Sequence, residues 1–268
     1  MEADKIIDIV KNVSDISDEV YADVVQPPAQ NVGKSLGTVT DLLNTLLTPI
    51  ELLNKTISLK KEKFLEEYKK NLKDIPEEKV ITPNFSLIGP MIEHLKYKIT
   101  EDELRKKYAK LISEASNTDG LTKPLLSFEN VLDQLSPYEI ELLSLLFSAL
   151  PDQVYPIASI KVSKDVGYNQ PYKNIPGVSF KNLPFETASV LISNFERLGI
   201  VYIDPLQYVE PASERYAYLE NSLLYQSLQI QCLASREQTN LPYPACEIEK
   251  HMFCLTEFGK SFVATVIA

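Results

Sequence analysis

The sequence predicts a mainly α-helical fold with a smaller α+β part, in which an N-terminal helical bundle is followed by a winged-helix-like C-terminal domain. Over the first half, apolar residues recur at steps of three and four, as on one face of a helix. Over the second half, helical patterns alternate with short β-branched segments. A polar stretch with glycine and proline lies between them at 117–124. We therefore expect a helical domain over residues 1–126 and an α+β domain over residues 127–268.

Three apolar stripes predict the helices that begin the chain. The first covers residues 2–24 and ends before the prolines at 27–28, because proline supplies no amide hydrogen. The second covers 36–47, and Pro49 either kinks that helix or starts a new one. The third covers 53–72 beside many lysines and glutamates, a mixture that suits a solvated face.

Further helices are expected before the boundary. Gly89-Pro90 is expected to open one of them, since proline is well tolerated in a first turn. Thr100 and Glu103 predict a capping box at the start of the next, in which each side chain satisfies a free backbone amide of the other residue. A short helix is expected over 127–135.

The C-terminal half begins with a strong helix start. Ser136 and Glu139 form a predicted capping box with proline in the first turn. A helix is expected over 185–198, ended by Gly199. Its inward residues are expected to be Val190, Leu191, Phe195 and Leu198. Strands are expected over 157–162, 200–203, 216–219, 223–231 and 251–255. Thr256 is expected to cap a closing helix.

The order of these segments favours a winged helix. A helix that ends in Leu198-Gly199-Ile200 is followed by strands, and a Leu-Thr-x-x-Gly motif at 255–259 follows the last of them. Both features are common in that fold. The stretch 205–250 is unusually long for a wing.

Composition and charge limit the classes of function that the chain can have. The chain has 268 residues, of which 44% are apolar and 24% charged, as in an ordinary globular protein. Its net charge of −10 argues against a general nucleic-acid binder, which needs lysine and arginine, and against docking on anionic lipid. We find no spanning stretch and no secretion signal. Three cysteines, all late in the chain, predict no disulfide framework and a cytoplasmic location.

One segment resembles a phosphate-binding loop. Gly33-Lys34-Ser35 has the residues that end such a loop, but the loop needs a glycine at position 28, which is Pro28. We therefore expect a polar helix start and no nucleotide cofactor.

A second set resembles a zinc site. Cys232, Cys246, His251 and Cys254 offer three thiols and an imidazole, which zinc accepts. Their spacing contains no Cys-x-x-Cys pair, and on a strand His251 and Cys254 would point to opposite faces. We expect buried cysteines that act as small apolar residues, and no metal.

No catalytic residue is predicted. The two histidines, His94 and His251, lie more than half the chain apart, and no nucleophile motif flanks either one. His94 is expected to be an ordinary surface residue. Acidic pairs such as Glu77-Glu78 and Glu101-Asp102 are expected of solvated helix starts. The sequence thus predicts a protein that is not an enzyme.

The helix at 185–198 is a poor candidate for reading DNA. It carries Glu186, Glu196 and Arg197 but no lysine, whereas side chains that read the major groove are usually arginine or lysine. From Pro137 to Ala268 the chain has 9 Lys and Arg against 14 Asp and Glu, a net charge of −5. This part is therefore expected to bind protein rather than nucleic acid.

Short motifs occur in order along the chain. They are Asn31-Val32-Gly33-Lys34-Ser35-Leu36-Gly37, Pro49-Ile50-Glu51-Leu52-Leu53-Asn54, Ile75-Pro76-Glu77-Glu78, Ser86-Leu87-Ile88-Gly89-Pro90, the segment 103–111 and Leu135-Ser136-Pro137. In this order they resemble the Abi-alpha (abortive infection alpha) family, over roughly residues 20–200 with a looser tail. The departure is Lys106-Lys107-Tyr108, where the family tends to have an acidic residue and phenylalanine. The resemblance implies a bacterial phage-defence protein, whose cell stops growing or dies before phage can spread, and it carries over no catalytic residue.

Three functions remain open at this stage. The first is a non-enzymatic protein-interaction component of anti-phage defence, which binds a phage component or a host target and is compatible with a homo-oligomer. The second is a membrane-acting toxic effector that inserts the apolar 36–53 segment; a core helix is favoured there, because membrane-surface helices usually carry a basic polar face. The third is a winged-helix DNA-binding regulator.

Overall fold

The computed structural model describes residues 28–51, 55–149, 154–179, 182–239, 241–242 and 244–268. The helix predicted over 2–24 lies outside them. The chain divides into two compact units, Met1–Gln134 and Leu135–Ala268. The division falls between residues 134 and 135, whereas the sequence placed the boundary between residues 126 and 127.

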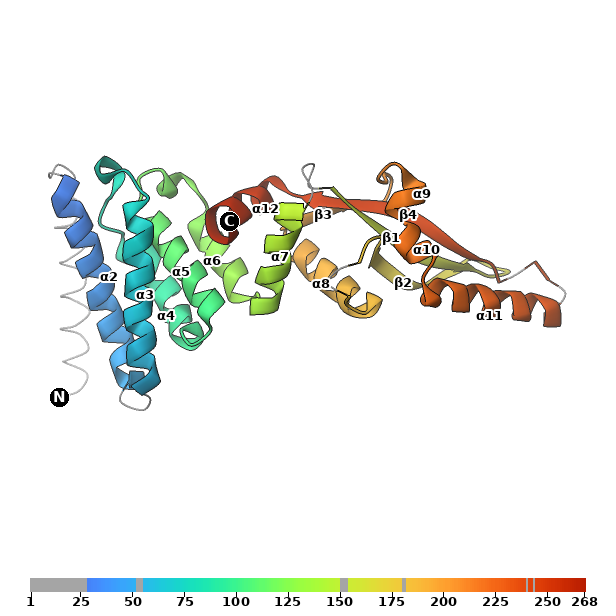
Figure 1. The fold of residues 1–268 in the computed structure, drawn as a ribbon, viewed down its shortest axis with the longest axis horizontal. Helices are drawn as coiled ribbons and strands as arrows, with labels where there is room; N and C mark the ends of the chain where they lie inside the picture. The colour runs from blue at the N-terminus through green and yellow to red at the C-terminus, as the bar shows by residue number, and fades with distance from the viewer. Residues whose placement is uncertain (1–27, 52–54, 150–153, 180–181, 240, 243) are drawn as a thin grey trace. The chain divides into compact units, whose positions relative to one another are not determined.

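The first unit is helical in its described part. Its elements are α2 (Pro28–Glu51), α3 (Lys55–Lys73), η2 (Glu77–Lys79), α4 (Phe85–Lys98), α5 (Asp102–Ala115), η3 (Gly120–Thr122) and α6 (Leu125–Asp133). Helix α5 packs against α3, α4 and α6, and α2 packs against α3 and α4 (Figure 1). Phe64, Tyr68, Tyr108 and Phe128 are fully buried among these helices. The predicted helical bundle is therefore confirmed.

Two predicted helix starts in this unit are wrong. Helix α4 begins at Phe85, where the Asn84 side chain accepts the backbone amide of Ser86, so Pro90 lies inside the helix. Helix α5 has Glu101 as its N-cap, with no side-chain cap, and the box predicted from residues 100 and 103 does not form. Ion pairs made by the first turn of α5 replace that box, as described below.

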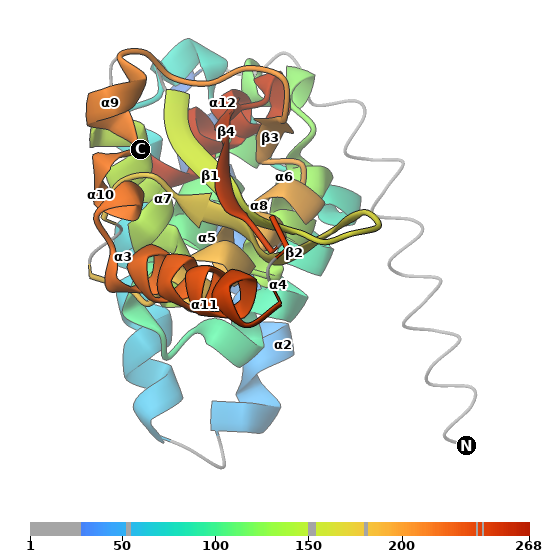
Figure 2. The same ribbon diagram turned by 90° about the vertical axis from the view of Figure 1, so that its right-hand side faces the viewer.

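The second unit combines helices with one antiparallel sheet of order β2-β1-β4-β3. Its elements are α7 (Pro137–Ala149), β1 (Val154–Ser163), β2 (Tyr168–Pro176), α8 (Phe185–Arg197), β3 (Val201–Asp204), α9 (Ala212–Arg215), α10 (Ala217–Glu220), α11 (Leu223–Thr239), β4 (Cys246–Leu255), α12 (Glu257–Phe262) and the π-helical turn η4 (Val263–Ile267). Helix α11 runs alongside β4 (Figures 1 and 2).

Three local signals in this unit are confirmed. Ser136 and Glu139 bond reciprocally, with the Glu139 amide 3.2 Å from Ser136 Oγ and the Ser136 amide 2.9 Å from Glu139 Oε2. The Thr256 hydroxyl accepts the Gly259 amide at 2.8 Å and so caps α12. Gly199 has a φ of +72°, a conformation that glycine adopts without strain.

Other predictions for this unit are wrong. The segments predicted as strands over 216–219 and 223–231 are helical, because Tyr225, Leu228 and Cys232 recur at helical spacing on the side of α11 that faces the sheet. Val190 was expected to point inward but is 68% exposed, since Ala188 and Ile192 take the buried face of α8. Strand β2 was not predicted.

One face of the sheet forms a compact core. Ala158, Ile160 and Ile175 from β1 and β2 pack against Tyr216 and Leu219 from the segment that precedes α11. The long stretch between β3 and β4 thus contains α9, α10 and α11, which cover this face. Helix α8 followed by the antiparallel pair β3–β4 matches the predicted order of elements, and the winged-helix label stays a prediction.

Candidate interaction surface

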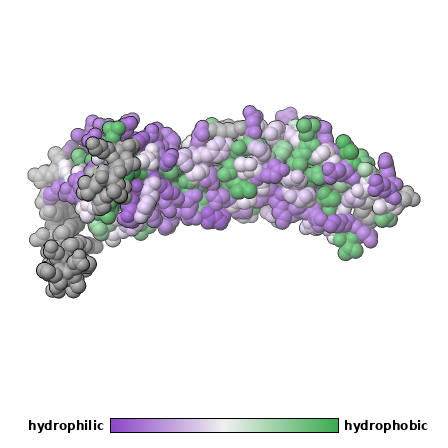
Figure 3. Space-filling view, turned by 90° about the horizontal axis from the view of Figure 1, so that it is seen from below, coloured by the Kyte–Doolittle hydropathy of each residue, from purple (hydrophilic) through white to green (hydrophobic). Residues whose placement is uncertain are grey.

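Exposed apolar side chains are concentrated in the second unit. Of the 18 large apolar side chains that are exposed in the described residues, 13 belong to residues 135–268. They are Tyr138, Leu145, Val166, Tyr168, Val190, Tyr202, Leu206, Tyr208, Tyr218, Leu223, Ile230, Leu233 and Leu241. Figure 3 shows apolar residues among polar ones on the face of this unit that carries α8 and α11. Single exposed apolar side chains are normal on a protein surface, whereas a contiguous set of them marks a surface that binds other molecules.

Part of this surface is hollowed into a groove between α8, α10 and α11. The groove has a volume of about 690 Å³ and is lined by Pro184, Phe185, Glu186, Ala217, Tyr218, Asn221, Ser222, Leu223 and Leu224. The rings of Phe185 and Tyr218 lie 5.5 Å apart at 51°, a favourable tilted contact. Leu223 is 84% exposed at the first turn of α11. We call this feature the α8–α11 groove.

The lining of the α8–α11 groove contains apolar side chains and a few polar ones. Phe185 and Leu224 also pack against the core of the sheet, so this apolar part of the lining is held in place by the core. The side chains of Asn221 and Ser222 bond to the carbonyls of Ala217 and Leu219, so the polar lining is satisfied internally. Among the described residues that line the groove, Glu186 alone is charged.

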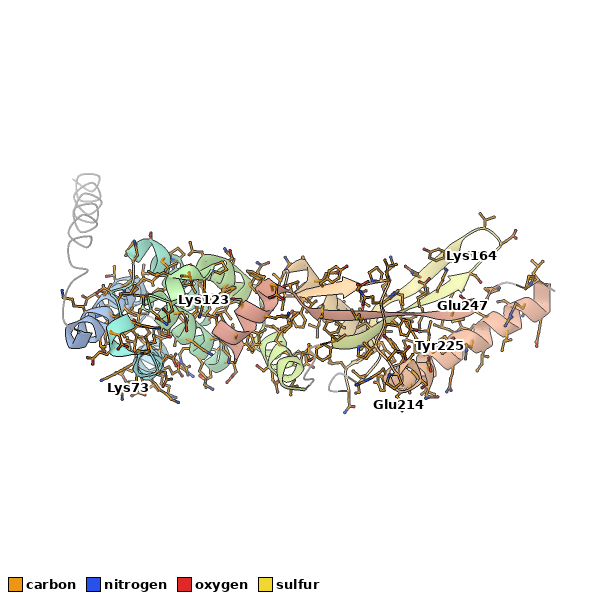
Figure 4. The ribbon with its side chains drawn as sticks, turned by 90° about the horizontal axis from the view of Figure 1, so that it is seen from above. Lys73, Lys123, Lys164, Glu214, Tyr225 and Glu247 are labelled. Carbon is orange, nitrogen blue, oxygen red and sulfur yellow. The ribbon has the colours of Figure 1, made fainter. Side chains whose placement is uncertain are left out.

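A second, more polar hollow of about 570 Å³ lies between α10, α11 and β4. Glu220 and Lys250 form an ion pair of 2.7 Å in its lining. The Tyr225 hydroxyl donates to the Cys246 carbonyl at 3.4 Å, and burial raises the pKa of this tyrosine. Figure 4 labels Tyr225 together with Glu247 of β4, which also lines this hollow. These contacts attach α10 and α11 to β4.

The four residues that resemble a zinc site in the sequence are spread out. Cys232 on α11 contacts Cys246 on β4, and burial together with that contact raises the pKa of Cys246 to about 11. Cys254 lies at the other end of β4, because Cys246 pairs with Val162 and Cys254 with Val154. The imidazole of His251 contacts the Pro205 carbonyl at 3.0 Å. In the part of the chain that the structure describes, no three His, Cys, Asp or Glu side chains are arranged to hold a metal ion.

The segment that resembles a phosphate loop is helical. Gly33, Lys34 and Ser35 lie within α2, so their backbone amides are not presented by a loop. The Ser35 side chain points into the unit, where its hydroxyl is 2.7 Å from the hydroxyl of Tyr68. The Tyr68 hydroxyl is also 2.7 Å from that of Ser116, which completes a buried chain of three hydroxyls.

His94 lies at the surface, with 38% of its side chain exposed, but it has a buried partner that the sequence did not predict. Its Nδ1 bonds to Oε1 of Glu129, whose side chain is only 3% exposed, and this bond raises the pKa of His94. One turn further along both helices, Lys98 pairs with Asp133 at 3.0 Å. The matched i, i+4 spacing on α4 and α6 is the signal that could have revealed both pairs.

Tyr108 of α5 lies close to the same carboxylates. Its hydroxyl is buried and has no hydrogen-bond partner among the described residues. Burial raises its pKa, and the nearby charges of Asp133 and Glu129 raise it further. The phenol is therefore neutral at physiological pH.

A second ion network joins α3 to α5. The Arg105 side chain is 3% exposed, and its Nε and Nη2 donate to the two carboxylate oxygens of Glu67 at 3.1 and 2.8 Å. Asp102 accepts from Lys60 at 2.6 Å and from Arg105 at 2.5 Å, which holds its pKa well below its usual range. Asp102 was expected only at a solvated helix start, so this network was missed.

Helix α2 contains most of the segment proposed for membrane insertion, and α8 is the helix considered for DNA binding. Val39, Leu42 and Leu43 of α2 are buried in the core of the first unit. No helix within the described ranges is both long and apolar enough to cross a membrane. On α8, Glu186 and Glu196 are exposed, and the guanidinium of Arg197 bonds to Asn194 Oδ1 at 2.8 Å.

The described fold is that of a mainly helical protein of two units, with a small antiparallel sheet in the second. The model of the family described as abortive infection alpha matches residues 58–266. The chain therefore belongs to this family, which is connected with abortive infection, and the resemblance seen in the sequence is confirmed. The match begins at residue 58 and runs to residue 266, whereas the resemblance was placed over roughly residues 20–200 with a looser tail.

Other comparisons add little. No curated protein matches the chain. The structure of an uncharacterized protein from the hydrocarbon-degrading marine bacterium Alcanivorax borkumensis SK2 is similar over 53% of this chain and 94% of its own, at 14% identity and a TM-score of 0.35.

Proposed function

We propose that the chain is a non-enzymatic component of bacterial abortive infection that acts in the cytoplasm by binding a protein, either a phage component or a host target. The observation that carries this proposal is the α8–α11 groove, an open apolar hollow in a member of a family connected with phage defence. Hollows with apolar and aromatic linings are common places for a partner to bind.

The protonation and the contacts of Cys246, His94 and Tyr108 support binding rather than catalysis. The raised pKa of Cys246 keeps it a neutral thiol, which is a poor nucleophile. His94 is engaged by a buried carboxylate, and Tyr108 is a buried neutral phenol. Each of these groups contributes to packing between elements of one unit.

Challenge with phage tests the biological role. Cells with and without the gene are infected over a range of multiplicities, and survival and phage yield are recorded. We expect protection of the culture at low multiplicity and loss of infected cells at high multiplicity. Equal survival and equal phage yield in the two strains at every multiplicity would contradict a defence role.

Pull-downs test the mode of action. Tagged wild-type chain is recovered from infected and uninfected cells and compared with the Leu223→Ser chain, which changes a side chain that is 84% exposed and leaves the core intact. We expect at least one protein whose recovery depends on infection and falls with the variant. Identical sets of proteins in all samples would count against binding through the groove.

The DNA-binding regulator and the membrane effector each predict a behaviour that the proposed function does not. A DNA-binding regulator would retard promoter DNA at low salt, because phosphate contacts release counterions. A membrane effector would float with vesicles, which requires α2 to expose residues that are buried in the first unit. We expect neither behaviour from the purified chain.

A further inference from the structure

The charge around the α8–α11 groove suggests the chemistry of its occupant. Residues 184–239, which include α8, α9, α10 and α11, contain 7 Asp and Glu against 3 Lys and Arg, a net charge of −4. Glu186 lies in the lining itself, at the first turn of α8. It is exposed and forms no ion pair with any described residue. An apolar hollow whose charged lining residue, among the described residues, is an exposed carboxylate is complementary to an apolar segment that also carries a cation.

The apolar lining suggests how such an occupant is anchored. Phe185 and Tyr218 form an aromatic wall, and Leu223 stands at the opening with 84% of its surface exposed. A hollow of about 690 Å³ has room for one or two large side chains. Binding energy at protein interfaces is concentrated in such buried anchors, while charges at the rim select the partner.

We propose that the α8–α11 groove binds a protein segment that inserts a leucine or aromatic side chain between Phe185, Tyr218 and Leu223 and pairs a neighbouring lysine or arginine with Glu186. This rests on the proposed function and names the class of partner that the same surface accepts. Nucleic acid and anionic lipid do not fit, because both are negatively charged like Glu186.

Selection from a random peptide library tests this class of partner. A library of peptides about 15 residues long, enough for several helical turns, is selected on the immobilised full chain and counter-selected on the Leu223→Ser chain. We expect the enriched peptides to carry net positive charge and at least one leucine or aromatic residue. Absence of enrichment over the counter-selected protein, or enrichment of neutral or acidic peptides, would overturn the proposal.

Matched variants then locate the binding. The affinity of the most enriched peptide is measured by fluorescence anisotropy. We expect Leu223→Ser and Glu186→Lys each to weaken binding by about tenfold or more. Two controls should change it less than about twofold: Leu206→Ser, which removes a 91% exposed leucine outside the groove, and Glu214→Lys, which makes the same charge change on α9. If Glu214→Lys weakens binding as much as Glu186→Lys, the attraction is one of net charge and the groove is not the site.

The outcome can be separated from that of the proposed function. The phage challenge is repeated with the Glu186→Lys and Leu223→Ser genes. Protection by the wild-type gene together with full protection by both variants would refute the groove inference while defence stands. No protection by the wild-type gene would refute the defence role whatever the peptides show.

Discussion

His94 and Glu129 form a hydrogen bond that joins α4 to α6 through an imidazole and a carboxylate whose side chain is 3% exposed. Lys98 and Asp133 repeat this link one turn further along the same two helices. The short helix α6 is therefore attached by two polar links in addition to its apolar face.

This bond predicts a stability that depends on pH. Glu129 raises the pKa of His94 in the folded chain, so the contribution is fully present below the unfolded pKa of about 6.5 and is lost as the pH rises through the folded pKa. We expect the free energy of unfolding of the wild type to exceed that of His94→Gln most at about pH 6, and the difference to shrink toward pH 8.5. Urea denaturation at several pH values measures this.

A second variant isolates the cause. Glu129→Gln removes the charge that raises the pKa of His94 while keeping an acceptor for the imidazole. In the Glu129→Gln background, the His94→Gln substitution should lose this pH dependence. An unchanged pH dependence in that background would contradict the assignment.

Among the charged residues described in the first unit, replacement of Arg105 should lower the free energy of unfolding most. Arg105→Met leaves Glu67 without its bidentate partner in a site where the guanidinium is 3% exposed, so we expect a loss of about 3 kcal/mol in the free energy of unfolding. Lys106→Met is the matched control, because its pair with Glu103 is more than half exposed and should contribute less than about 0.5 kcal/mol. Equal stabilities of the two variants would show that the α3–α5 ion network contributes little.

The sequence predicted those parts of the fold that short-range rules determine. The helix cap at Thr256 and the turn at Gly199 depend on neighbours within a few residues, and both formed as expected. The segment that became α11 was misassigned, because its uncharged residues show both periodicities and only packing on the sheet decides between them. Within the candidate site, the acidity of α8 was visible in the sequence. The groove itself was not, since its walls come from segments more than thirty residues apart.

Replacing Tyr68 and Tyr108 by phenylalanine should change the free energy of unfolding in opposite directions. Tyr68→Phe leaves the buried hydroxyls of Ser35 and Ser116 without their shared partner and should cost about 1–2 kcal/mol. Tyr108→Phe removes a buried hydroxyl that has no partner among the described residues, so it should be neutral or stabilising by up to about 1 kcal/mol. Thermal and urea unfolding of both variants check this. A loss of similar size in both would mean that the Tyr108 hydroxyl is satisfied, for instance by bound water.

Gly259 should be the least replaceable glycine of the second unit. A Cβ at this position would lie 1.9 Å from the Ile200 carbonyl oxygen, a backbone atom, so α12 would have to move away from the turn at Gly199. We expect Gly259→Ala to cost more than about 3 kcal/mol. Gly37→Ala, in a helical position of α2 where a Cβ meets nothing within 4 Å, should instead stabilise the chain by about 0.5–1 kcal/mol. Hydrogen exchange read by mass spectrometry should place the loss of protection for Gly259→Ala in residues 135–268. Unchanged protection there would show that the turn and α12 can separate at little cost.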